Sequence, residues 1–273
     1  MAAVSQATLI LSEVVEHLNH HQAQAALTLL QTLLAEDSDN GNYWDYQLAA
    51  CAMARRFEDA EAAYLRCEQL GVRHPETLIN AANNAGNWGR ADLMLHYAYL
   101  ILQHFPNEQI SGLQFRINAL WMQRRCAESL VACEQLLQLA PENASALTFC
   151  IKNLLGLDRP GDALAHCNRL LAQLADGPER LAVVRLRIEA LIAYGALSEA
   201  LQQAHAWLAQ HPNDPNPQMH SALCFFSQFD AGLSVPWGGN LPKTMPVCAR
   251  PTANPSHTGP IHASPTNHCI SAC

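Results

Sequence analysis

The sequence carries few charged residues and has no concentrated basic stretch. Charged residues make up 15% of the 273 positions, and 24 acidic residues against 16 basic ones give a formal net charge of −8. Proteins that bind nucleic acids rely on clustered Lys and Arg side chains that neutralise phosphates. We therefore expect no nucleic-acid partner. Apolar residues make up 49% of the chain, which is enough to build a substantial core.

The sequence also lacks an export signal and a long apolar run. Its first 18 residues contain no basic residue ahead of the apolar stretch, which is interrupted by Ser12, Glu13 and Glu16. The longest apolar run near the middle, residues 97–102, is far shorter than the ~20 residues that cross a bilayer. These absences predict a cytoplasmic protein that does not insert into membranes.

No motif of catalysis or cofactor binding occurs in the chain. The sequence contains no GxGxxG, Walker A, HExxH or GxSxG pattern. His17 and His21 lie four residues apart and could share a helix face, but a metal site needs further ligands. We interpret them as solvated surface histidines. The sequence thus predicts a protein that is no enzyme and binds no metal or cofactor.

The ten cysteines include no CxxC pair, and a chain of this size without an export signal does not need a disulfide framework. Free cysteine packs as a small hydrophobic residue. Six cysteines fall on apolar stripes of expected helices, so we predict reduced and mostly buried side chains for Cys51, Cys67, Cys126, Cys133, Cys150 and Cys167.

What the sequence does contain is a repeat. Six times a small residue is followed by further apolar or small residues four and seven positions later, a spacing that places them on one helix face. These anchors are 34, 31, 38, 34 and 37 residues apart, at Ala26, Ala60, Ala91, Ser129, Ala163 and Ala200. A second amphipathic segment begins about sixteen residues before each anchor, and clusters of Pro, Gly, Asn and Asp separate the units. The pattern predicts six helical hairpins.

This pattern resembles the tetratricopeptide repeat, a 34-residue helix-turn-helix with the signature W-x2-L-G-x2-Y, then A-x3-F, then P. The matches in the second unit are Trp44, Leu48, Phe57, Ala60, Tyr64 and Cys67; those in the fourth are Leu113, Ile117, Leu120, Ser129, Cys133 and Pro141. The sixth unit matches at Ala200, Trp207 and Pro212. The resemblance implies an all-α solenoid of about six hairpins over residues 7–214, wound as a superhelix with a concave groove. It also implies an interaction scaffold that binds a peptide or extended segment of another protein.

In the family, ligands are held by the first helix of each repeat. Carried onto this sequence, that implies a groove with Arg73, Asn80, Asn83, Asn84, Gln114, Asn118, Lys152 and Arg185. Asparagine is a poor helix former, so three in one helix suggest a function. A side-chain amide has two donors and an acceptor for the backbone of a bound peptide. The alternative, that these are ordinary polar residues on a solvated face, stays open, and the mixed lining predicts no ligand charge.

The composition changes toward the C-terminus. Residues 215–230 have the apolar pattern of a helix that would cap the sixth hairpin. Residues 231–273 hold 7 of the 15 prolines and no acidic residue, and such a segment cannot bury a core. We expect a disordered tail, whose Cys and His residues fit no familiar zinc spacing.

A second resemblance lies at this junction. The segment His220-Ser221-Ala222-Leu223, followed by Phe229-Asp230, is similar to the point where repeats enter the catalytic half of bacterial O-linked N-acetylglucosamine transferase-like proteins. An asparagine-lined superhelix is also that family's means of recruiting substrates. This resemblance implies an alternative function: the substrate-recruiting half of such an enzyme, without its catalytic half.

Overall fold

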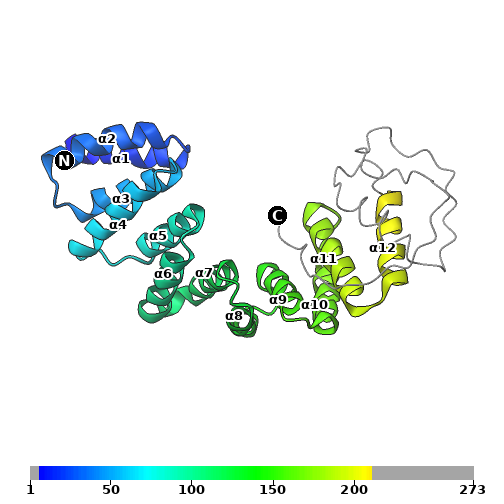
Figure 1. Ribbon diagram of the computed structural model, residues 1–273. Helices are drawn as coiled ribbons and strands as arrows, with labels where there is room; N and C mark the ends of the chain where they lie inside the picture. The colour runs from blue at the N-terminus through cyan, green and yellow to red at the C-terminus, as the bar shows by residue number, and fades with distance from the viewer. Residues whose placement is uncertain (1–5, 211–273) are drawn as a thin grey trace, which may run out of the picture. The chain divides into compact units, whose positions relative to one another are not determined.

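The computed structural model describes residues 6–210. These residues form an all-α structure with no strand among them, as predicted (Figure 1). The helices are α1 (Gln6–Asn19), α2 (Ala23–Glu36), α3 (Gly41–Met53), α4 (Phe57–Gln69), α5 (Pro75–Trp88), α6 (Ala91–His104), η1 (Pro106–Glu108), α7 (Gln109–Met122), α8 (Cys126–Leu139), α9 (Ala144–Gly156), α10 (Pro160–Gln173), α11 (Pro178–Tyr194) and α12 (Leu197–Gln210).

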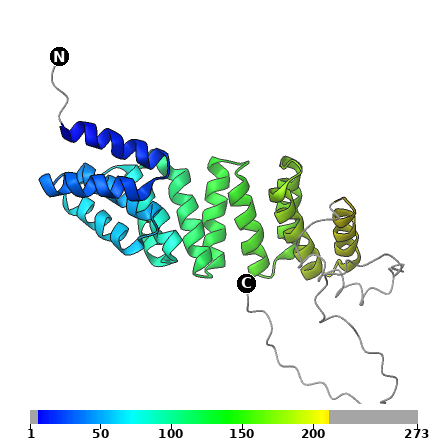
Figure 2. The same ribbon diagram turned by 90° about the horizontal axis from the view of Figure 1, so that it is seen from above.

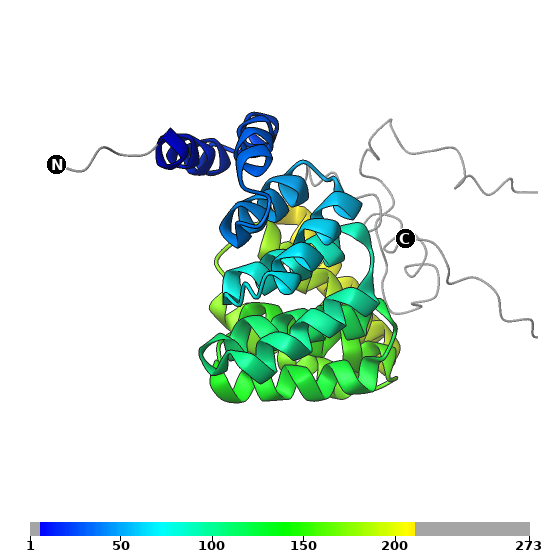
Figure 3. The same ribbon diagram turned by 90° about the vertical axis from the view of Figure 1, so that its left-hand side faces the viewer.

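The α-helices pair into six hairpins, each made of an odd-numbered first helix and an even-numbered second helix. Every helix packs on its neighbours in the chain, and the first helices of successive hairpins also pack on one another, from α1 on α3 through α9 on α11. Figures 2 and 3 show this succession from two other directions. The prediction of six hairpins is confirmed.

The turn inside each hairpin follows one geometry. One residue between the two helices takes a left-handed backbone conformation, and a backbone N–H after it bonds back to the first helix; Arg56 N–H, for example, donates to the Cys51 carbonyl oxygen at 2.9 Å. The left-handed residues are His21, Arg55, Gly89, Arg124, Asp158 and Gly195, which are 34, 34, 35, 34 and 37 residues apart. The structural period is therefore more regular than the anchors in the sequence suggested.

The anchor proposed for the third unit was wrong. Measured from the turns, the position equivalent to Ala60 is Met94, whereas Ala91 is the first residue of α6. The sequence search required a small residue there, but Met94 is large and 5% exposed. The first helix makes the room instead, because a Cβ added at Gly86 would lie 2.9 Å from the Met94 Cε. In this repeat the small residue, Gly86, lies on the first helix and the large one, Met94, on the second.

The core runs through consecutive hairpins and is built mainly of Leu, Ile and Ala side chains. Fully buried alanines such as Ala26, Ala60 and Ala163 allow two helix backbones to approach closely. Stacked hairpins share this core because one hairpin alone cannot bury its apolar face. The six repeat cysteines are free thiols, and all but the partly exposed Cys126 are buried, as predicted.

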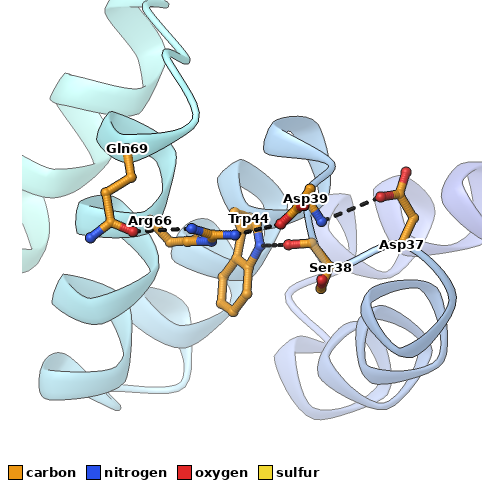
Figure 4. A network of polar contacts seen from close by, with 6 residues as sticks. All are labelled: Asp37, Ser38, Asp39, Trp44, Arg66 and Gln69. Atoms are coloured by element: carbon orange, nitrogen blue, oxygen red, sulfur yellow. Dashed lines mark hydrogen bonds and ion pairs between the residues drawn. The ribbon is translucent and has the colours of Figure 1, made fainter.

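Polar contacts hold the connection between the first two hairpins (Figure 4). The Trp44 Nε1–H donates to the Ser38 carbonyl oxygen at 2.8 Å. The Arg66 guanidinium on α4 pairs with the Asp39 carboxylate at 2.5 Å and donates to the Gln69 Oε1 at 3.1 Å. The loop that leaves α2 is therefore attached to both helices of the next hairpin.

Some predictions fall beyond the part of the chain that the structure describes. The capping helix at 215–230, the disordered tail at 231–273 and the transferase-like junction all lie outside the described residues. Within residues 6–210, no helix is both long and apolar enough to cross a membrane. No group of three or more metal-ligating side chains occurs there either, and the His17 ring bonds to the Gln22 side chain.

Candidate functional site

A hollow of about 590 Å³ lies along the first helices α5, α7 and α9, with Met94 of α6 also in its wall, and we call it the amide hollow. On each first helix the lining residues recur after three or four positions, some as adjacent pairs, so each set occupies one broad helix face. The hollow is lined by Asn83, Gly86, Asn87, Met94, Gln114, Phe115, Asn118, Trp121, Met122, Ser145 and Phe149.

The structure brings three of the residues predicted for the groove together in the amide hollow. Asn83 comes from α5, and Gln114 and Asn118 come from α7. The Gln114 Nε2 donates to the Asn118 Oδ1 at 3.4 Å, a long bond, and the other amide donors and acceptors of both side chains have no partner within residues 6–210. None of the described residues that line this hollow is acidic. Three neutral amides with spare hydrogen-bonding capacity therefore face the same space.

An aromatic pair forms another part of the wall. The rings of Trp121 and Phe149 meet edge to face with centroids 5.9 Å apart. The Lys152 Nζ lies 5.2 Å from each of the two ring centroids, so the ring faces attract its positive charge. The Arg124 guanidinium carbon lies 5.8 Å from the Trp121 ring. Lys152, predicted for the groove, is thus held beside the amide hollow by two of its lining residues.

The sequence analysis missed Trp121 and Phe149. Both could have been found by extending the helix-face spacing, because Trp121 lies three residues after Asn118 on α7 and Phe149 lies three before Lys152 on α9. A tryptophan or phenylalanine in a repeat is first interpreted as core. Here both are only partly buried.

Asn84 does not belong to the groove, and its assignment there was wrong. The side chain is fully buried, and its Nδ2 donates to the Phe57 carbonyl oxygen at 3.0 Å, across the contact between α5 and the start of α4. Its neighbour Asn83 is exposed, because consecutive residues of a helix point in directions about 100° apart. Asn84 therefore joins two repeats and is not available to a ligand.

Asn153 has the same structural role two repeats later. Asn84 and Asn153 are each the tenth residue of their first helices, α5 and α9. The Asn153 Nδ2 donates to the Ser129 Oγ at 2.8 Å, and the Ser129 hydroxyl donates to the Ile117 carbonyl oxygen at 3.2 Å. All three groups are buried, so this chain of bonds links α9, α8 and α7 inside the core.

The remaining predicted groove residues lie elsewhere. Arg73 lines a second hollow of about 380 Å³ at the other end of α5, together with side chains of α4 and α6 such as Glu68 and His104. Asn80 is partly buried and Arg185 is exposed, and neither lines the amide hollow. The structure therefore does not bring these three together with Asn83, Gln114 and Asn118.

The solved structures PilW and Acl4 share the fold of this chain with TM-scores above 0.5. PilW, described as a widely conserved type IV pilus biogenesis factor, matches 81% of this chain and 100% of its own with 12% identity and a TM-score of 0.64. Acl4, the assembly chaperone of RpL4, matches 82% and 96% with 12% identity and a TM-score of 0.54. TTC0263, a thermophilic TPR protein of Thermus thermophilus, matches 80% and 98% with 20% identity and a TM-score of 0.46.

The chain has the tetratricopeptide-repeat fold. At these identities the likeness concerns the fold and not the function. No protein-family model and no curated protein matches the sequence significantly. Within the tetratricopeptide solenoid, the amide hollow is formed mainly by the first helices of the third, fourth and fifth repeats, with one residue from the second helix of the third repeat.

Proposed function

We propose that this chain is a protein-interaction scaffold that holds an extended segment of a partner protein in the amide hollow. The observation that carries the proposal is the convergence of Asn83, Gln114 and Asn118 beside Trp121 and Phe149. Binding sites are typically concave and largely apolar, with a few polar groups that fix the orientation of the ligand. Side-chain amides can pair with both the N–H and the C=O groups of a peptide backbone.

The sequence of the rest of the chain favours binding over catalysis. The sequence holds none of the common catalytic or cofactor motifs, and its excess of acidic residues is unsuited to a phosphate backbone. Acl4, which shares the fold, carries the name of an assembly chaperone for another protein. A partner that is a protein is therefore the simplest occupant of the amide hollow.

The test compares two triple variants of the tagged chain in co-purification from a lysate of the source organism, quantified by mass spectrometry. The first variant replaces Asn83, Gln114 and Asn118 with Ala and removes amides that each contribute about 1 kcal/mol of net hydrogen bonding. The matched control replaces Gln31, Gln103 and Gln138, exposed amides on the second helices α2, α6 and α8.

We expect partners that bind the wild-type chain and the control variant but are lost from the hollow variant. Both variants should keep the far-ultraviolet circular dichroism of the wild type, because none of the six side chains lies in the core. Partners that remain fully bound to the hollow variant would assign the interaction to another surface and refute the proposal.

A further inference from the structure

The amide hollow also indicates the chemistry of the segment that it binds, an inference that rests on the proposed function. We infer that the bound segment carries a side-chain carboxylate next to a large apolar side chain. The apolar side chain enters the hollow, and the carboxylate pairs with Lys152 at its edge.

The apolar part of the inference follows from the walls. Met94, Phe115, Trp121, Met122 and Phe149 all line the hollow, and Met122 is 37% exposed although it is a large apolar side chain. Methionine side chains are flexible and polarizable, so they adapt to the shape of an inserted group. A volume of about 590 Å³ has room for an aromatic or long aliphatic side chain together with part of the backbone.

The charged part follows from the ion pairs. Eight of the thirteen arginines in the described chain have carboxylate partners, among them Arg125 with Glu128 and Arg187 with Glu199. Lys152 has no carboxylate partner among the described residues, although acidic residues outnumber basic ones in the chain. Its ammonium is held over two aromatic rings, which attract the charge without neutralising it.

The position of Lys152 decides which charge the ligand carries. An ammonium forms its stronger hydrogen bonds with carboxylates, and the ring contacts already fix the direction of this side chain. The net charge of −8 opposes an acidic ligand only weakly, because exposed charges farther away than the screening length of about 8 Å at physiological salt are largely screened. In the part of the chain that the structure describes, no acidic side chain lines the hollow itself. The local attraction by Lys152 therefore outweighs the distant acidic residues.

The three amides do not select a particular peptide sequence. Asn83, Gln114 and Asn118 can bond to a peptide backbone whatever its sequence. The preference for a partner thus depends on the apolar walls and on Lys152. A segment with an Asp or Glu beside a Phe, Trp, Leu or Met has both features.

The experiment selects binders from a displayed library of random nine-residue peptides with the full-length chain as bait. For the wild type we expect enrichment of peptides with an acidic residue next to a large apolar residue. The variant Lys152→Glu should reverse the charge preference and enrich Lys or Arg beside the apolar residue. The matched control Arg185→Glu makes the same change in net charge at an exposed cation of α11 outside the hollow, so its selection should equal that of the wild type.

One selected peptide is then synthesised with an acetylated N-terminus and an amidated C-terminus, and its Kd is measured by titration calorimetry. Replacing its acidic residue by the matching amide should weaken binding to the wild type by about twofold to fivefold, the range of a partly exposed ion pair. The same replacement should leave the Kd for Lys152→Met unchanged, because the partner charge is gone.

The outcomes separate the inference from the function on which it rests. Selection of apolar peptides that lack an acidic residue and do not bind the hollow triple variant would overturn the inference and leave the proposed function standing. An identical charge preference for the wild type and Lys152→Glu would overturn it as well. Peptides that bind the hollow triple variant as tightly as the wild type would overturn the proposed function.

Discussion

The side-chain amide of Asn84 donates a hydrogen bond to the backbone carbonyl oxygen of Phe57, 3.0 Å away, and so connects the third repeat to the second. This asparagine is fully buried, although it stands in a polar stretch of sequence between Asn83 and Asn87. The bond explains why a poor helix former is kept in the middle of α5, since its amide joins two hairpins.

Replacing Asn84 with Ala should destabilise the fold, although Ala is the better helix former. Loss of a buried hydrogen bond costs about 1–2 kcal/mol, which exceeds the few tenths gained in helix propensity. The measurement is urea denaturation, with Asn83→Ala as the exposed control that should change the free energy of unfolding by less than about 0.5 kcal/mol. Equal stability of both variants would show that the bond to Phe57 is unimportant.

Replacing Ser129 with Ala should be costly, although Ala occupies the equivalent position in four other repeats. The Ser129 hydroxyl accepts from Asn153 and donates to the Ile117 carbonyl oxygen, so its loss leaves a buried amide without its partner. The expected loss of stability is about 1–3 kcal/mol. The double variant Ser129→Ala with Asn153→Leu should recover part of it, because both polar groups are then gone. No recovery in the double variant would contradict this account.

The small size of Gly86 compensates for the large side chain of Met94, and this can be tested by introducing the residues that another repeat has at the two positions. In the fifth repeat the equivalent positions hold Leu155 and Ala163. Gly86→Leu alone should destabilise the chain by overpacking against Met94, a change that typically costs about 1–3 kcal/mol. Adding Met94→Ala should relieve that clash, and a double-mutant cycle in denaturant measures the coupling. Additive effects of the two changes would mean that the side chains do not compete for the same space.

The buried thiols predict both a labelling order and a dependence of stability on pH. Burial raises the pKa of the Cys67 and Cys167 thiols from 9.0 to about 12. They should therefore be alkylated more slowly than the partly exposed Cys126 in the native state at pH 8, as followed by mass spectrometry. In denaturant all six repeat cysteines should react without added reductant. Fast native labelling of Cys67 would show that the hairpins open readily.

The same thiols determine whether the free energy of unfolding rises or falls with pH. Between pH 9 and about 12 the unfolded thiols have lost their protons, while the folded ones keep them. The folded state then binds more protons, so the free energy of unfolding falls as the pH rises through this window. Replacing both cysteines by Ala should reduce the slope of stability against pH in denaturation at pH 8.5 to 10.5.

The sequence was sufficient to predict the hairpins because the spacing of apolar residues indicates the helices, and clusters of Pro, Gly, Asn and Asp mark the breaks between them. It could not separate Asn83 from Asn84, since helix ends are uncertain by a residue or two and one residue turns a side chain by about 100°. The sequence also did not reveal that a small Gly86 makes room for a large Met94, for another reason. It involves two residues on different helices, and a search along one stripe tests only one of them.

The left-handed turn residues recur at nearly constant intervals, each with the same backbone bonding on either side. A cut at one such turn and a rejoining at the next would bring together two backbone ends of the same conformation. Removal or duplication of a whole hairpin thus disturbs only the two surfaces that meet at the seam. A solenoid of this construction can gain or lose hairpins, and so change the extent of its binding face, while every turn keeps the same geometry.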